Sequence, residues 1–184
     1  MSARVHLRRW RESDLAPFRR MNADSAVMRY FPGLLSPEES DALARRIEKD
    51  FLRNGFGLWA VAIPGRTEFA GFAGLARPRF APERVEIAWR FDRAFWGEGF
   101  ATEAAAMALE RGFSEVQLES IVAFTAEINV PSVRLMKRLG MQFSHVFAHP
   151  ALRAASQLSR HVLFEMSRSA WMNARRPFAD LFKP

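Results

Sequence analysis

A pair of glycines directly before a helix-forming run is the feature that most constrains how this chain can fold. Gly97 and Gly99 close a short loop after a predicted strand at 84–91, and residues 101–113 follow as a run of strong helix formers. A second apolar, β-branched strand is predicted at 120–126. This order of strand, glycine loop, helix and strand indicates a mixed α/β fold.

The same loop indicates a binding site for an anion. Unpaired backbone N–H groups at the positive end of a helix dipole attract phosphate oxygens, and glycines let a ligand approach the backbone. Taken alone, a short G-x-G loop is more often only a tight turn. Two specific nucleotide motifs are excluded, because Thr102 stands where a dinucleotide fingerprint needs Gly or Ala, and no G-x-x-x-x-G-K-[ST] loop occurs.

The rest of the chain reads as strands and helices of ordinary length. The helix at 37–53 has the clearest boundaries, because Ser36 and Glu39 form a capping box and Gly55 follows its end. Further strands are predicted at 5–10, 56–63, 68–76, 141–148 and 161–166, and further helices at 12–22 and 130–139. Seven strands and about four helices predict one domain over residues 1–184, with no element assigned from Ser167 onward.

Composition limits the class of protein. Of the 184 residues, 49% are hydrophobic and 26% charged, which is typical of a soluble globular domain. The absence of Cys excludes disulfides, thiol nucleophiles and cysteine-ligated zinc. The N-terminus lacks the apolar region of a signal peptide, and no stretch of about 18 apolar residues predicts a membrane span. We therefore expect a cytoplasmic protein, monomeric or homodimeric, without a membrane partner.

The excess of basic over acidic residues allows a nucleic-acid-binding domain as one alternative. The net charge is +7, but the arginines are scattered as short pairs, and no run of five or six like charges occurs. No helix-turn-helix or aromatic RNA-binding motif is recognisable. The charge is better interpreted as a solvated surface with one anion pocket. The four histidines show no metal-ligand spacing, and no G-x-S-x-G motif of a serine hydrolase is present, so no metal site is expected.

Three ordered motifs carry a family resemblance. They are Trp96-Gly97-Glu98-Gly99-Phe100-Ala101-Thr102-Glu103-Ala104, Asn129-Val130-Pro131-Ser132 and Leu139-Gly140-Met141. Together they resemble the acyl-CoA-binding core of the GNAT superfamily of N-acetyltransferases. Flanking segments, among them Leu7-Arg8-Arg9-Trp10 and Val85-Glu86-Ile87, are similar to the branch that acetylates the N-termini of ribosomal proteins.

The resemblance implies a fold and a cofactor. The fold is a mixed, mostly antiparallel seven-stranded sheet with a V-shaped splay between the strands at 85–91 and 120–126. Acetyl-CoA lies in that opening, with its pyrophosphate on the amides of 97–102 and its pantetheine along the strand edge as in β-augmentation. The cofactor-binding residues so implied are Trp89, Phe91, Trp96, Gly97, Glu98, Gly99, Phe100, Ala101, Thr102, Asn129 and Ser132. For Asn129, a role only as a helix N-cap is an equal alternative.

Some positions depart from the family pattern. Ala94 stands where the superfamily often has Gln or Arg, and Glu98 suits a diphosphate site only if its side chain points away. Arg134, Lys137 and Arg138 share a helix face that either holds the 3′-phosphate of the coenzyme or is simply solvated, the latter being favoured.

The resemblance implies acetyl transfer to a primary amine, with Glu86 and Ser132 as catalytic candidates. Glu86 matches the position of a general base, and an ion pair with a nearby Arg is the alternative. The usual acid, a Tyr, is replaced by Met136, which leaves Ser132 as the nearby hydroxyl, while Tyr30 is expected at the acceptor mouth. Because these candidate acid and base groups are weak, we expect an acceptor amine with a low pKa, such as an N-terminal α-amine. A non-catalytic acyl-CoA-binding module is a second alternative.

Overall fold

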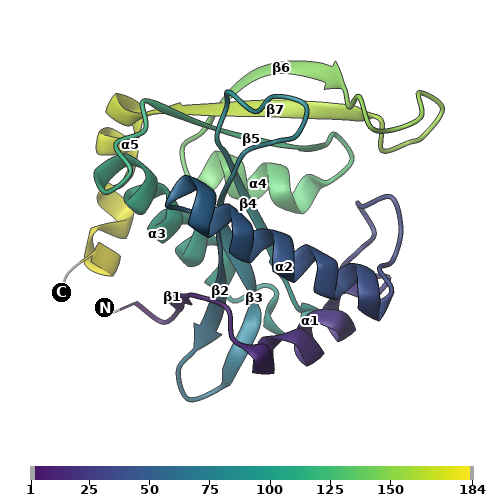
Figure 1. Cartoon of the computed structure of the whole chain (residues 1–184). Coiled ribbons are helices and arrows are strands. Elements are labelled where there is room, and N and C mark those ends of the chain that lie inside the picture. The colour runs from purple at the N-terminus through teal and green to yellow at the C-terminus, as the bar shows by residue number, and fades with distance from the viewer. Residues whose placement is uncertain (1–2, 183–184) are drawn as a thin grey trace.

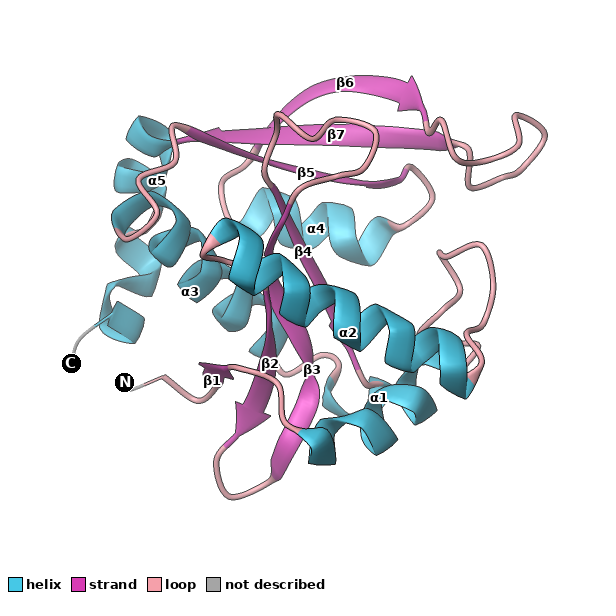
Figure 2. Ribbon diagram, in the orientation of Figure 1, coloured by secondary structure: helices cyan, strands magenta, loops and turns pink. Residues whose placement is uncertain are grey.

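The computed structural model describes residues 3–182, whose strands form one seven-stranded sheet (Figures 1 and 2). The strands are β1 (His6–Arg8), β2 (Leu58–Ile63), β3 (Thr67–Ala76), β4 (Glu86–Phe91), β5 (Ser120–Ala126), β6 (Gln142–Ala148) and β7 (Arg160–Ser167). The helices are α1 (Leu15–Asn22), α2 (Pro37–Asn54), α3 (Phe100–Ser114), α4 (Val130–Arg138) and α5 (Arg168–Ala174), with short 3₁₀ turns at Glu12–Asp14, Arg93–Phe95 and Arg176–Phe182. No helix within residues 3–182 is both long and apolar enough to cross a bilayer.

The sheet opens between its two central strands. The strand order is β1-β2-β3-β4-β5-β7-β6, and every neighbouring pair is antiparallel except β4 and β5. The parallel pair meets at a single register position, Glu86 opposite Val122, whereas β3 and β4 stay paired from Gly71–Phe91 to Ala76–Glu86. In Figure 1, β4 accordingly diverges from the β5–β7–β6 layer above it. The predicted fold and its V-shaped splay are confirmed.

Core packing on β4 separates its two faces. Side chains alternate along a strand, so Ile87 and Phe91 point to the face where they join the apolar core around α3. Arg90 pairs with Phe72 of β3 and points to the opposite face, where Phe72 packs with Phe18 of α1. Helix α3 is buried along most of its length, with Ala104, Ala105, Ala106, Ala108 and Leu109 fully covered. The helix therefore lies inside the core and is not a surface helix with one apolar face.

The helix boundaries follow the local signals. The capping box of α2 is present, since the Ser36 hydroxyl accepts from the N–H of Glu39 and the Glu39 carboxylate accepts from the N–H of Ser36. Gly55 ends that helix in the left-handed conformation, at φ 75°. At α3 the first helical residue is Phe100, one position before the prediction, and Gly99 is the N-cap.

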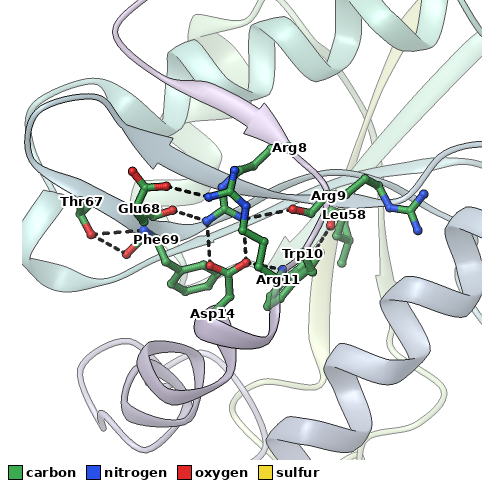
Figure 3. A network of polar contacts seen from close by, with 9 residues as sticks. All are labelled: Arg8, Arg9, Trp10, Arg11, Asp14, Leu58, Thr67, Glu68 and Phe69. Carbon is green, nitrogen blue, oxygen red and sulfur yellow. Dashed lines mark hydrogen bonds and ion pairs between the residues drawn. The ribbon is translucent and has the colours of Figure 1, made fainter.

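The first strand is shorter than predicted. We expected residues 5–10, but β1 ends at Arg8 because the following side chains bind other elements (Figure 3). Arg8 forms a bidentate ion pair with buried Asp14, both bonds at 2.7 Å, and Trp10 Nε1 donates to the carbonyl of Leu58 at 2.7 Å. These contacts turn the chain toward α1.

The tail from Ser167 forms part of the core. Trp171 of α5 is fully buried, stacks on Phe113 of α3, and donates its indole N–H to Glu110 at 2.8 Å. Arg175 completes the contact with an ion pair to Glu110 at 2.6 Å. The sequence predicted no element here, because the segment lacks a strong periodic pattern.

Candidate active site

The loop before α3 presents a row of free backbone donors. Gly97 and Gly99 have φ angles of 80° and 88°, which L side chains rarely adopt. The N–H groups of residues 97–102 donate to no acceptor within residues 3–182, and a Cβ on Gly97 would meet no atom within 4 Å. The six unpaired donors lie at the positive end of α3, with open space beside Gly97, and this arrangement suits a diphosphate.

Two arginines compensate the acidic residues of this loop and of the first turn of α3. Glu98 turns its carboxylate to Arg66 of the β2–β3 turn, with Nη1–Oε2 at 2.6 Å, and this contact lowers the pKa of Glu98. Arg4 pairs with buried Glu103 at 3.0 Å and also donates to the carbonyl of Glu98 at 3.2 Å. Sequence reasoning missed both arginines, since partners 32 and 99 residues apart leave no local signal. The side chain of Glu98 thus has a partner other than the loop amides.

A tryptophan supports the approach to the loop. Trp96 is half exposed, and its Nε1 donates to the carbonyl of Phe91 at 2.9 Å. This hydrogen bond ties the loop to the last residue of β4. One lone pair of the Phe91 carbonyl is consequently occupied. The main-chain group of Phe91 that remains fully free to bind a ligand is its N–H.

The splayed edge of β4 carries main-chain groups that face the opening. Asp92 N donates to Ala70 O at 2.9 Å. The direction of main-chain hydrogen bonds alternates along an antiparallel strand, so every second residue back from Asp92, including Arg90, also bonds toward β3. The main-chain groups of Ile87, Trp89 and Phe91 then point toward β5. Beyond the contact at Glu86 and Val122, β5 no longer pairs with β4. Trp89 and Phe91 therefore lie on the edge of β4 that β5 leaves unpaired.

Glu86 lies at the vertex of the V without an ionic partner. It is partly exposed, and within residues 3–182 no Arg, Lys or His nitrogen lies within 4.0 Å of its carboxylate. Desolvation raises its pKa to about 8. The alternative of an ion pair with a nearby Arg was wrong, because the local arginine, Arg84, pairs with Glu165 at 2.8 Å.

The Asn129 motif forms the start of α4. The Asn129 side chain accepts from Ser132 N at 3.4 Å, and its amide donates to Thr125 Oγ1 at 2.8 Å and to Ser132 Oγ at 3.1 Å. The N-cap role is thus present, and three of the bonding positions of Asn129 are filled within the chain. The Ser132 hydroxyl accepts in this network and keeps its own hydrogen to donate.

Two other features of α4 bear on the site. Met136 is 2% exposed and belongs to the core, so the position of the usual Tyr offers no reactive group. Arg134, Lys137 and Arg138 are all exposed on α4. Nothing among the described contacts ties these three side chains to the glycine loop.

A ring cluster covers the β5–β7–β6 side of the opening. His149 and His161 have ring centroids 4.7 Å apart, and Phe80 and Phe124 pack against His149. Burial lowers the pKa of both histidines. In the described part of the chain, no three His, Cys, Asp or Glu side chains gather closely enough to hold a metal ion.

Comparison with known proteins agrees with this geometry. The family model described as "Acetyltransferase (GNAT) domain" matches residues 4–142. YkkB of Bacillus subtilis is 30% identical over 143 residues, covering 77% of this chain and 83% of that protein. The FsC-acetyl coenzyme A-N(2)-transacetylase of Aspergillus fumigatus is 28% identical over 131 residues, covering 67% and 55%. A GNAT-family acetyltransferase structure from Bacillus anthracis superposes with a TM-score of 0.77 at 23% identity, covering 90% of this chain and 96% of that one.

Proposed function

The chain belongs to the GNAT acetyltransferase family, and on that premise we propose that it transfers the acetyl group of acetyl-CoA to a primary amine. One observation carries the proposal: six successive backbone N–H groups, at residues 97–102, lie free at the start of α3. Such an array fits the pyrophosphate of a coenzyme. A relative whose name specifies acetyl coenzyme A, the FsC transacetylase, supports the same donor.

We assign the donor site to the loop and the splayed strand. The amides of Gly97, Glu98, Gly99, Phe100, Ala101 and Thr102 would hold the pyrophosphate. Free main-chain groups of Trp89 and Phe91 would pair with the pantetheine amides, and Trp96 would keep the loop at the end of β4. Asn129 and Ser132 would contact the coenzyme from the start of α4, with Asn129 acting chiefly through the cap that orients Ser132.

Three groups divide the chemistry in this proposal. Glu86 takes a proton from the acceptor ammonium, because a carboxylate whose pKa is about 8 is a far stronger base than an ordinary one. The N–H of Trp89 faces the opening and would stabilise the oxyanion. As the C–N bond forms and the C–S bond breaks, Ser132 would donate the proton that the departing thiolate needs, in place of the Tyr that Met136 replaces. The attacking nitrogen sheds its extra proton in the same step, and that proton restores the hydroxyl.

The acceptor we favour is an N-terminal α-amine, as in the ribosomal-protein branch, with small-molecule amines as the other class. An α-amine has a pKa near 8 and is about a tenth neutral at pH 7, whereas a Lys side chain near 10.4 is almost wholly charged. A base with a pKa of about 8 is well matched to the first group. We propose that one domain carries the activity in the cytoplasm, as a monomer or homodimer, with no nucleic acid as partner.

Release of free CoA thiol tests this function. The purified protein is incubated with acetyl-CoA and a panel of N-terminal peptides, lysine-blocked peptides, polyamines and small amines. Thiol release that depends on one amine class supports acetyl transfer. Protection from thermal unfolding by acetyl-CoA without thiol release from any amine would instead indicate a non-catalytic acyl-CoA-binding module.

A further inference from the structure

A second charged side chain on β4 has no counter-ion. Arg90 lies two strand repeats beyond Glu86 on the same face, which is the face turned away from α3. It is only partly exposed, and no carboxylate within residues 3–182 lies within 4.0 Å of its guanidinium. Desolvation lowers the pKa of Arg90 to about 10, and no neighbouring charge opposes that shift.

Neutral contacts hold this guanidinium in place. Its Nη1 donates to Asn22 Oδ1 at 2.5 Å, and its Cζ lies 4.0 Å from the centroid of the Phe31 ring. The amide of Asn22 is itself fixed, because its Nδ2 donates to buried Ser40 at 2.8 Å. Nε of Arg90 is buried and has no partner. The charge is therefore held by neutral groups, and only one of the five N–H donors of Arg90 has a partner within residues 3–182.

An unneutralised, desolvated guanidinium is costly unless a ligand supplies the anion. A planar fork of N–H donors matches a carboxylate. The anion cannot be the pyrophosphate held by the α3 amides, because α3 packs on the opposite face of β4, beside Ile87 and Phe91. The acceptor reaches Glu86 on the Arg90 face, so the missing anion belongs to the acceptor.

We infer that the acceptor is an amine that also carries a carboxylate, with its amine at Glu86 and its carboxylate on Arg90. This inference rests on the proposed function and specifies the acceptor class of the same site. Strand geometry places the two Cα atoms about 13 Å apart, so the two groups of the acceptor are separated by several bonds. Simple alkylamines lack the anion, and diamines place a second cation against Arg90.

The test compares matched acceptors. The probes are ω-amino carboxylates of three to eight carbons and short peptides with Glu at the second or third residue, each paired with its carboxamide or Gln counterpart. We expect kcat/KM for the acid to exceed that for the amide by about 10- to 100-fold at the best length, the range for a hydrogen-bonded charge pair. Equal rates for acid and amide, or preference for a diamine, would overturn the inference.

Variants assign the selectivity to the residue. Arg90→Met keeps the apolar stem and should reduce the acid-to-amide ratio to near one, because kcat/KM for the acid falls by a larger factor than kcat/KM for the amide. Arg77→Met is the matched control, since Arg77 also lies over an aromatic ring and donates to a carbonyl but is exposed beyond the end of β3. An unchanged ratio in Arg90→Met contradicts the assignment.

Two further measurements distinguish a failure of the carboxylate inference from a failure of the proposed acetyl transfer. Competitive inhibition of wild-type protein by hexanoate, and none by hexanol, would show the carboxylate subsite without any variant. If Arg90→Met does not fold, the wild-type ratio and this inhibition still decide the question. Thiol release with neutral amines alone would retain acetyl transfer and reject the carboxylate, whereas no thiol release with any amine would reject the proposed function itself.

Discussion

Arg66, in the turn between β2 and β3, forms two hydrogen bonds with the carboxylate of Glu98, at 2.6 Å and 3.2 Å. This pair brings a positive group to the only acidic side chain within the glycine loop, residues 97–99. Both side chains are about half exposed, so the pair contributes little to folding, but it controls the charge that an incoming diphosphate meets.

Removing Arg66 should therefore weaken coenzyme binding more than stability. For Arg66→Ala we expect up to about fivefold weaker CoA binding at low salt, because the Glu98 charge is no longer compensated. Titration calorimetry measures the affinity. The double variant with Glu98→Gln should recover it, and a loss of affinity in Glu98→Gln alone would show that the carboxylate itself serves binding.

Gly97→Val should abolish CoA binding. A side chain at Gly97 enters open space beside the free amides and is strained at a φ of 80°. Gly55→Val is the matched control, because Gly55 has nearly the same φ of 75° and equally open surroundings at the end of α2. Both variants should lose similar stability in thermal unfolding. Unaltered CoA affinity in Gly97→Val would remove the role assigned to the loop.

The pH profile of turnover should report Glu86. Because the carboxyl has a pKa of about 8, it is mostly protonated at pH 7, and kcat/KM should rise with pH and level off above about 8. The profile is measured with an acceptor whose amine stays protonated across the range, so that the titration of the acceptor itself does not produce the inflection. Glu86→Gln should lower kcat by about 10²- to 10⁴-fold and remove the inflection while CoA affinity is kept. An inflection that persists in this variant assigns the titration to another group.

Glu86→Gln should also stabilise the free protein at alkaline pH. The raised pKa means that the folded state keeps a proton which the unfolded chain releases above about pH 4.5, so the free energy of unfolding falls as pH rises from there to about 8. Gln cannot ionise. At pH 9 we expect the variant to be more stable than wild type by about 1–3 kcal/mol, and near pH 4 about equal.

Denaturant unfolding at several pH values measures this difference. Glu83→Gln provides the control, since Glu83 is an exposed carboxylate three residues before Glu86. Its stability should run parallel to that of wild type at every pH. A parallel curve for Glu86→Gln as well would mean that the carboxyl is not desolvated in the folded protein.

Local chemistry made most of the fold predictable. The capping box at Ser36 and the glycine at 55 gave the limits of α2, and the glycine pair gave the start of α3 to within one residue. These signals act within one helical turn, so they are present in the sequence. The strand at 5–10 was overestimated because Trp10 and Arg8 bind residues that lie far along the chain, and no local pattern reveals such partners.

The candidate site was predictable in its backbone and not in its electrostatics. The loop at 97–102 was predicted from its glycines and the edge of β4 from the family resemblance, and the structure gives both of them unpaired main-chain groups. The partners of Glu98 and Glu103, and the lack of any partner for Glu86 and Arg90, depend on how distant elements pack. A Glu or Arg that has an ionic partner and one that has none look the same in the sequence. Only the folded chain shows which charges are neutralised.

The position of β7 has a consequence for laboratory work on fragments. The family match ends at residue 142, yet β7 pairs with β5 on one side and with β6 on the other. An expression clone trimmed to residues 4–142 would omit β7, all of β6 but its first residue, and Trp171. Such a clone would leave the β5 edge bare and prone to self-association, so the boundaries of a homology match are a poor guide to where this gene can be cut.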